Sequence, residues 1–161
     1  MKKLIVVRHG KSSWELNVRD HDRVLKQRGI DDGHLIGKQL GKIGVQPDLI
    51  WSSSAARALQ TATLVTEYLN YDLKLLKINR SLYTFNSEDL KDVVRSCTDD
   101  VDTLMIFSHN HGITDFVNHY GSERFDNVPT TGVVQLEFNI DKWNDLRAGS
   151  TPFHMFPKQL K

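Results

Sequence analysis

Two arginines and two histidines follow, within a few residues, segments that have the composition of buried strands. Arg8 and His9 follow one apolar run, Arg57 lies soon after a second, and His109 follows a third. Arginine offers a planar fork of donors that matches phosphoryl oxygens and stays charged at any working pH. A neutral imidazole has an exposed nitrogen lone pair, which can attack phosphorus and form a covalent intermediate. These residue types together indicate a phosphoryl-transfer site.

Several neighbours of these residues are expected to contact the substrate. Gly10 has no side chain, so its backbone can approach a phosphate closely or turn where a side chain would block the turn. Ser12 and Glu15 follow on the same segment, and Asn110 follows His109. Protonated His109 could stabilise the negative charge that develops on the phosphoryl oxygens.

Each assignment has a plainer alternative. His9 could be the polar end of a strand, and Arg57 could be an exposed helix residue. His111 could form a metal site with His109 and His119, because imidazole is a frequent ligand of transition metals. No acidic or cysteine ligand lies near these histidines in sequence. We therefore expect no metal and no cofactor, and we expect His111 to line the pocket or cap a helix.

The segments that would position these residues alternate between two types. Short apolar runs without alternation are typical of strands buried on both faces. The predicted strands are Leu4 to Val7, Asp48 to Trp51, Leu73 to Ile78, Thr103 to Phe107 and Val133 to Phe138. The predicted helices are Ile30 to Ile43, Ala55 to Leu69, Ser87 to Cys97 and a segment with Ile113 and Tyr120 on one face. An irregular tail is expected after Trp143.

This alternation predicts βαβ units and an α/β fold with three layers, α/β/α, around a mostly parallel central sheet. Ligands of such sheets bind beyond the carboxyl ends of the strands, where the candidate residues lie. Residues 1–161 contain no linker or low-complexity tract and are expected to form a single domain.

The composition argues against several classes of protein. A formal net charge of +1 gives no basic excess for binding nucleic acid through bulk electrostatics. Cys97 is the only cysteine, which rules out an intramolecular disulfide and a multi-cysteine metal site. Arg8 breaks the first apolar run, and no stretch approaches the length of a membrane span. We therefore expect a cytoplasmic protein that binds no membrane; the oligomeric state is left open.

Three motifs resemble those of the histidine phosphatase superfamily, which has the phosphoglycerate mutase-like fold. Arg8-His9-Gly10 directly after an N-terminal strand is similar to the first motif. The alanine-rich segment Ser52 to Ala62, which contains Arg57, is similar to the second, and Ser108-His109-Asn110 is similar to the third. The motifs occur in the order of the family, each at the end of a predicted strand.

A longer resemblance points to the short phosphohistidine phosphatases of the SixA type. The segments that carry it are Arg8 to Trp14, Asp22 to Leu25, Arg28-Gly29, Trp143, Leu146, Gly149 and Phe156 to Lys158. Phosphoglycerate mutases usually carry asparagine where Glu15 stands here. They also carry a long insertion with a proton-donating glutamate, where Leu82 to Leu90 is compact in this sequence.

The resemblance implies a phosphatase in which His9 is the nucleophile while Arg8, Arg57 and His109 hold the phosphoryl oxygens. A phosphohistidine-bearing protein is the favoured substrate, because the labile P–N bond of phosphohistidine depends less on an acid that protonates the leaving group. Glu15 and Glu88 are candidates for such an acid. A small phosphorylated metabolite or ester is the alternative substrate, and a non-catalytic phosphate-binding module is the alternative function.

Overall fold

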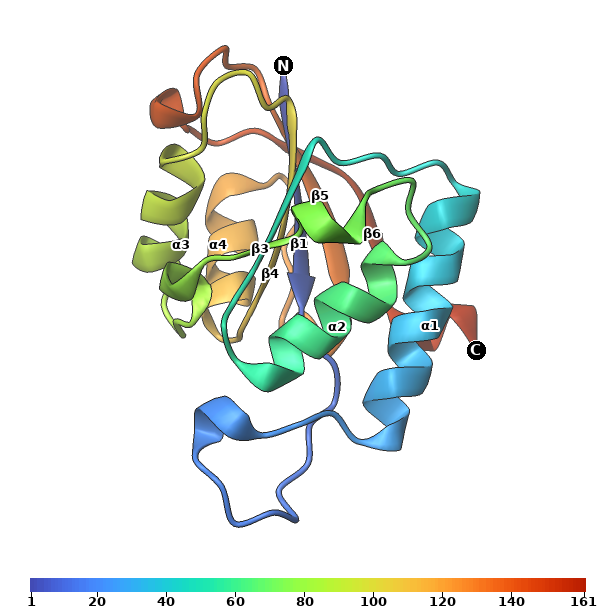
Figure 1. Cartoon of the computed structure of the whole chain (residues 1–161). Coiled ribbons are helices and arrows are strands. Elements are labelled where there is room, and N and C mark those ends of the chain that lie inside the picture. Colours follow the sequence, from blue (N-terminus) through green and yellow to red (C-terminus); the bar gives the residue numbers. More distant parts are fainter.

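The computed structural model of the protein describes residues 1–161 and is built around a six-stranded sheet (Figure 1). The strands are β1 (Lys2–Arg8), β2 (Leu49–Ser52), β3 (Lys77–Ile78), β4 (Thr103–Ser108), β5 (Val133–Phe138) and β6 (Ser150–Met155). Their order across the sheet is β3-β2-β4-β1-β5-β6. The first four strands in that order are parallel, whereas β5 pairs antiparallel with β1 and β6 pairs antiparallel with β5. The prediction of a mostly parallel sheet is confirmed.

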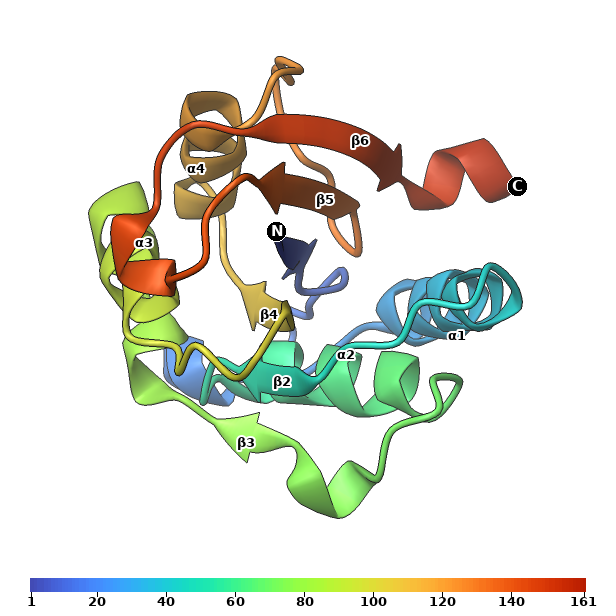
Figure 2. The ribbon, with the colours of Figure 1, turned by 90° about the horizontal axis from the view of Figure 1, so that it is seen from above.

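Helices cover both faces of this sheet, as Figure 2 shows. The helices are α1 (Gln27–Lys42), α2 (Ala56–Thr66), α3 (Ser87–Arg95) and α4 (Gly112–Tyr120). Alternate side chains of β1 enter the two cores: Leu4 and Val6 pack in the core with α3 and α4, whereas Ile5 and Val7 pack in the core with α1 and α2. A strand buried on both faces has an apolar side chain at every position, which explains the unbroken apolar run. The predicted three-layer α/β/α architecture is confirmed.

Two predicted segments differ from the structure. The tail after Trp143 is not irregular, because β6 forms an edge strand beside β5, with a shift in register between Gln135 and Glu137. Pro152 hid this strand: proline lacks a ladder donor and is confined largely to edge strands. The predicted strand from Leu73 to Ile78 contains a 3-10 turn at Leu73–Leu75, followed by the two residues of β3.

A long loop follows β1 and projects beyond the carboxyl end of that strand (Figure 1). Its ends are joined by an antiparallel bridge between Ser12 and Leu25, and we refer to it as the 12–25 loop. The Ser13 amide donates to the Val24 carbonyl at 2.8 Å beside this bridge. The loop also contains a 3-10 turn, η1 (Asp20–Asp22).

A second connection reaches the same edge of the sheet from the opposite direction. Because β5 runs antiparallel to β1, β5 begins at the edge where β1 ends. The Thr131 amide just before β5 lies 3.1 Å from the carbonyls of both Arg8 and His9. Thr131 has a φ of 58°, in the left-handed region that non-glycine residues rarely adopt. This connection therefore fixes the backbone at the end of β1.

None of the helices combines the length and the apolar character that crossing a bilayer would require.

Candidate active site

A cavity of about 330 Å³ lies at the carboxyl edge of the sheet. Its lining comes from the end of β1, the 12–25 loop, the start of α2 and three further loops. The lining residues are Arg8, His9, Lys11, Ser12, Trp14, Asp20, Arg23, Arg57, Phe85, Asn110 and Thr130. The ring of His109 lies next to that of His9, with 5.0 Å between the centroids. The structure thus brings together the four residues that the sequence motifs singled out.

His9 is 8% exposed, and one hydrogen bond orients its ring. The Nδ1 atom lies 2.7 Å from the Gly10 carbonyl oxygen, which accepts only, so Nδ1 carries the proton and donates. The Nε2 atom then keeps its lone pair, and the Arg57 Nε–H points to it at 3.4 Å. The pKa of His9 is lowered to about 3, mainly by burial. The bond to Gly10 raises this pKa, whereas the charges of Arg57 and Arg8 lower it. His9 is therefore a neutral imidazole near neutral pH, and its Nε2 lone pair accepts the long bond from Arg57.

The two guanidinium groups differ in how they are held. Arg57, in the first turn of α2, donates from one terminal nitrogen to the Asp20 carbonyl at 2.7 Å and from the other to the Asp20 carboxylate at 3.0 Å. Arg8 donates to the Val128 carbonyl at 2.9 Å, and its buried Nε has no partner in the protein. Arg8 therefore retains a free donor in a cavity that could take an anion.

His109 is fully buried behind the cavity. Its Nε2 lies 2.8 Å from the Ser53 hydroxyl, and its Nδ1 has no partner. Burial, together with smaller effects of the nearby His9 and Arg57, lowers the pKa of His109 to about 2. The ring is therefore neutral in this structure, whereas the expectation concerns His109 beside a phosphoryl group, whose negative charge would raise this pKa. A neutral imidazole can still donate one N–H to a phosphoryl oxygen.

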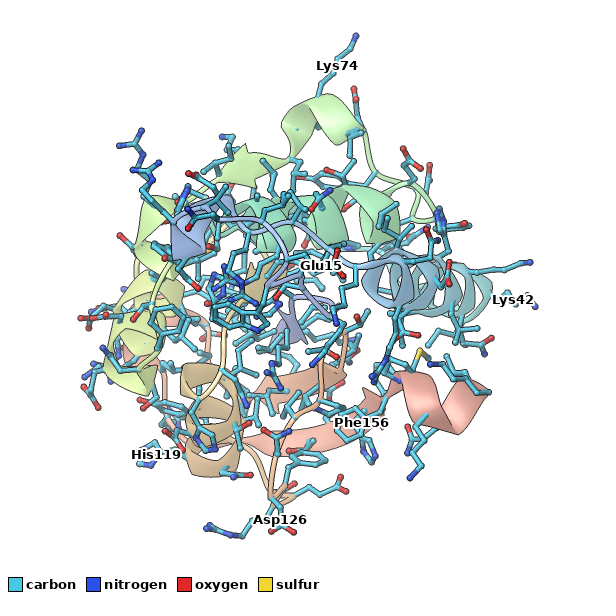
Figure 3. The ribbon with its side chains drawn as sticks, turned by 90° about the horizontal axis from the view of Figure 1, so that it is seen from below. Glu15, Lys42, Lys74, His119, Asp126 and Phe156 are labelled. Carbon is cyan, nitrogen blue, oxygen red and sulfur yellow. The ribbon has the colours of Figure 1, made fainter.

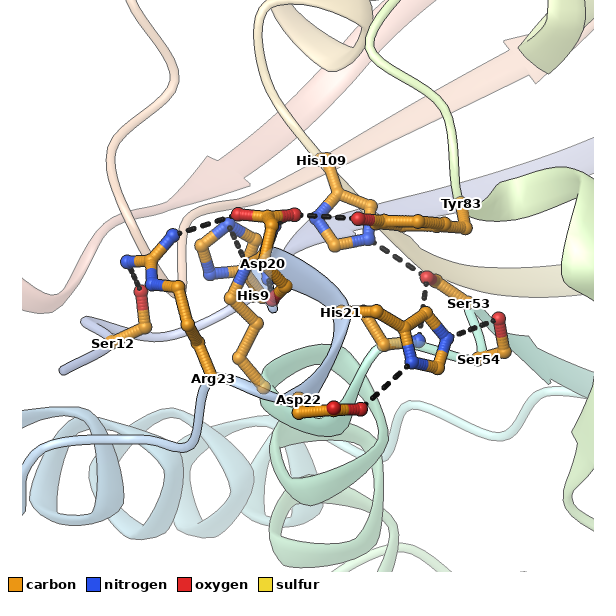
Figure 4. Close-up of polar contacts among 12 residues, drawn as sticks. His9, Ser12, Asp20, His21, Asp22, Arg23, Ser53, Ser54, Tyr83 and His109 are labelled. Atoms are coloured by element: carbon orange, nitrogen blue, oxygen red, sulfur yellow. Dashed lines mark hydrogen bonds and ion pairs between the residues drawn. The ribbon is translucent and has the colours of Figure 1, made fainter. Parts of the chain in front are cut away.

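Asp20 lies at the centre of the polar contacts, a position that sequence reasoning did not find (Figure 4). Its carboxylate accepts from Arg57 and Arg23 at 3.0 Å each and from the Tyr83 hydroxyl at 2.6 Å. Partial burial raises the pKa of Asp20, but the bonds from Tyr83, Arg57 and Arg23 outweigh it and hold this pKa well below its usual range. Asp20 is therefore ionised, and it ties the 12–25 loop to α2.

Arg23 contributes a third guanidinium to the cavity. It lies on the 12–25 loop at the cavity and also forms an ion pair with Asp20. Its Nη1 pairs with Asp20, its Nε donates to the Ser13 carbonyl at 3.0 Å, and its Nη2 donates to the Ser12 hydroxyl. The Trp14 ring stacks on this guanidinium, with 3.2 Å between its centroid and Cζ. The spacing of three residues between Asp20 and Arg23 was the only sequence signal for this pair.

The remaining expected contacts divide into two groups. Ser12 and Asn110 line the cavity, although the Asn110 side chain is bonded to Asn127 and Thr114. Gly10 lies behind the cavity, and its amide donates to the Thr61 hydroxyl at 2.9 Å. A Cβ atom on Gly10 would lie only 3.1 to 3.2 Å from three neighbouring atoms. A side chain at this position would press on the Gly29 carbonyl and on the Thr131 and Leu25 side chains.

Three other candidates lie away from the cavity. Glu15 is exposed on the 12–25 loop near the middle of the face in Figure 3, and it does not line the cavity; its expected substrate contact is corrected, because the loop carries it outward. Glu88 is exposed on α3 and pairs with Lys91 at 2.6 Å. His111 is exposed at the start of α4 and pairs with Asp115 at 2.9 Å. No group of three potential metal ligands is present.

Comparison with known proteins agrees with this geometry. The family model of the histidine phosphatase superfamily (branch 1) matches residues 4–80, which include Arg8, His9 and Arg57. The chain belongs to the histidine phosphatase superfamily. An uncharacterised chloroplastic protein of Arabidopsis thaliana is 31% identical to this chain over 120 residues, which is 69% of the chain. The chain spans 55% of that relative's length.

Solved structures of the superfamily share the whole fold. A structure from Agrobacterium tumefaciens, assigned to the phosphohistidine phosphatase SixA, is 22% identical with a TM-score of 0.81, covering 97% of this chain and 98% of that one. The protein histidine phosphatase SixA in complex with tungstate is 20% identical with a TM-score of 0.84, covering 99% of both chains. At these identities, the likeness establishes that this superfamily member has the SixA fold.

Proposed function

We propose that residues 1–161 act as one domain and form a phosphatase that removes a phosphoryl group through a covalent intermediate on His9. The observation that carries the proposal is the state of His9: a neutral ring, with its proton on Nδ1 and its Nε2 lone pair beside Arg57. A nucleophile needs such an available lone pair, and the guanidinium groups supply positive charge where a phosphoryl group would sit.

The first step would be attack of His9 Nε2 on phosphorus. A new P–N bond to His9 forms while the bond to the leaving group breaks, and the leaving group takes that electron pair. Water then attacks phosphorus, the bond to Nε2 breaks, and inorganic phosphate leaves as His9 regains its lone pair. Arg8, Arg57 and the neutral N–H of His109 would stabilise the charge on the phosphoryl oxygens in both steps.

We further propose that the phosphoryl group comes from a phosphohistidine of a protein. Asp20 is the only carboxyl group in the cavity lining, and its low pKa leaves it ionised at neutral pH. Release of an ester alkoxide is helped by a protonated acid, whereas an imidazole is a better leaving group and depends less on one. The two SixA structures, which share this fold, are described as a phosphohistidine phosphatase and a protein histidine phosphatase, and this supports the same substrate.

A small phosphorylated metabolite is the second candidate substrate. The observation that favours it is the cavity volume of about 330 Å³, which lies within the range of small-molecule sites. In that case the Tyr83 hydroxyl, which donates to Asp20 in the cavity lining, would be the candidate acid.

A substrate panel tests the proposal. Phosphohistidine, a histidine-phosphorylated protein, phosphoserine peptides and sugar phosphates would be compared by release of inorganic phosphate. We expect the two phosphohistidine substrates to have the highest kcat/KM. Preference for a sugar phosphate would favour the second candidate, and the absence of any turnover would favour a phosphate-binding module.

The variant His9→Ala tests the nucleophile in the same assay. We expect activity to fall at least about a thousandfold, as for other covalent nucleophiles, and acid-labile labelling of the protein by substrate to disappear. His119→Ala is the matched control, because His119 is exposed on α4. Full activity of His9→Ala would remove His9 from the reaction.

A further inference from the structure

Four large apolar side chains are exposed on the two segments that bring Trp14 and Phe85 to the cavity. Trp14, Leu16 and Val18 lie on the 12–25 loop and are 73%, 58% and 44% exposed, and Phe85 before α3 is 51% exposed. We refer to these four residues as the apolar rim. Leu16 and Val18 belong to a run of exposed residues from Trp14 to Arg19. Clustered exposed apolar side chains are typical of interaction surfaces, whereas scattered ones are not.

The part of the loop that carries this rim is held in place from its base. The Ser12–Leu25 bridge closes the loop, and Arg23 bonds to Ser12 and Ser13 on one side of its guanidinium. Trp14 stacks on the same guanidinium and so has one covered and one exposed face. A loop with fixed ends and a stacked anchor loses less conformational entropy when a partner binds.

The apolar rim is continuous with the cavity. Trp14 and Phe85 line the cavity themselves, together with Arg8, Arg23 and Arg57. The surface therefore has a cationic centre that fits a phosphoryl group and a border that fits apolar side chains. The ring of Phe85 also lies 5.4 Å from that of His109, which places the border directly beside the reacting groups.

We propose that the apolar rim is the docking surface for a folded protein that presents its phosphorylated histidine from an apolar patch. This proposal rests on the phosphatase function proposed above. A free metabolite that fits within 330 Å³ would leave Leu16 and Val18 in water, because neither residue lines the cavity. A folded protein whose phosphohistidine reaches His9 would instead cover the 12–25 loop, which projects beyond the carboxyl end of β1 (Figure 1). Interface centres are commonly built from such aromatic and aliphatic anchors around a buried polar group.

The double variant Leu16→Ser/Val18→Ser tests this surface. Both side chains point into solvent, so the variant should fold and keep its cavity. With a folded domain phosphorylated on one surface histidine as substrate, we expect kcat/KM to fall about tenfold, from the apolar contact area lost. With free phosphohistidine as substrate, we expect kcat/KM to stay within about twofold of the unmodified chain, since the reacting groups are unchanged.

Leu75→Ser is the matched control, because Leu75 is 56% exposed and lies ahead of β3, away from the carboxyl edge of the sheet. It should leave both rates unchanged. Equal loss on both substrates in the double variant, or no loss on the protein, would overturn the docking surface while the phosphatase function stands. An unmodified chain that hydrolyses neither phosphohistidine substrate would overturn both proposals.

Discussion

The hydrogen bond from His9 Nδ1 to the Gly10 carbonyl decides which ring nitrogen can attack phosphorus. The same burial that hides this ring lowers its pKa to about 3, so we expect it to stay neutral with its proton on Nδ1 down to pH 5. Nitrogen-15 NMR of the imidazole signals that disappear in His9→Gln measures both properties. A proton on Nε2, or a titration midpoint between pH 6 and 7, would contradict this assignment.

Arg57 depends on the shape of its guanidinium as well as on its charge. It points one N–H to His9 and two others to Asp20, a geometry that a lysine ammonium does not reproduce. We therefore expect Arg57→Lys to weaken inhibition by vanadate at least about tenfold. Arg147→Lys is the control, since Arg147 bonds only to the Asn139 carbonyl. Equal inhibition constants in the two variants would remove Arg57 from the anion site.

The sequence motifs located Arg8, His9, Arg57 and His109 because each lies next to a strand end, and strand ends in a parallel sheet meet at one edge. Asp20 was missed for a physical reason. It lies in a loop without periodicity, and only the path of that loop brings it back to Arg57. Glu15 was misplaced for the same reason, because the outward course of the loop is not encoded in the spacing of its residues.

The start of α1 packs closely against the backbone of Lys11, just before the 12–25 loop. A Cβ on Gly29 would lie 2.4 Å from the Lys11 carbonyl oxygen, a backbone atom that has little room to move. Alanine would favour the helix by about 1 kcal/mol. We nevertheless expect Gly29→Ala to lower the free energy of unfolding by about 1–3 kcal/mol, as overpacking does, and to reduce activity by displacing the loop.

Urea unfolding measures this change against Gly33→Ala in the same helix. A Cβ on Gly33 meets only the Leu64 side chain, with 3.0 Å to its terminal carbon, which can rotate away. Gly33→Ala should therefore be close to neutral. If both variants unfolded at the same urea concentration, close packing at Gly29 would not be the reason for glycine there.

Prediction of the elements from sequence succeeded where one physical signal dominated. The buried strands β1 and β4 contain unbroken apolar runs, Leu4 to Val7 and Leu104 to Phe107, and the α2 segment is rich in alanine. β6 was missed because its residues Ser150–Met155 combine proline and histidine with partly exposed positions. Its pairing depends on β5 being beside it, a long-range contact that no local pattern records.

For the molecule as a whole, the two buried histidines make stability depend on pH. His9 and His109 have pKa values of about 3 and 2 in the folded chain, against 6.5 for an ordinary histidine. Below pH 6.5 the unfolded chain therefore binds more protons, and the free energy of unfolding falls as the pH falls. Between pH 6 and 4 we expect a loss of up to about 1.4 kcal/mol per pH unit for each histidine.

Urea unfolding at pH 7, 6 and 5 measures this slope. His109→Gln removes one of the two titrating groups and should reduce the slope by about half, whatever its effect at pH 7. Asp20 contributes at lower pH: its lowered pKa stabilises the fold above the ordinary carboxyl value of 3.8, and that contribution is lost as the pH falls below it. An unchanged slope in His109→Gln would show that His109 has the same pKa in the folded and unfolded chains.

Because β5 runs in the reverse direction, the connection before it can change in sequence independently of the strands that carry the histidines. Because β5 starts at the edge where β1 ends, the connection before it supplies Thr130 to the cavity wall without belonging to either histidine-bearing strand. Exchanges at Thr130 can therefore alter one wall while β1 and β4 retain their sequences. Substrate preference in such a scaffold can diverge through that connection while the chemistry at His9 is inherited intact.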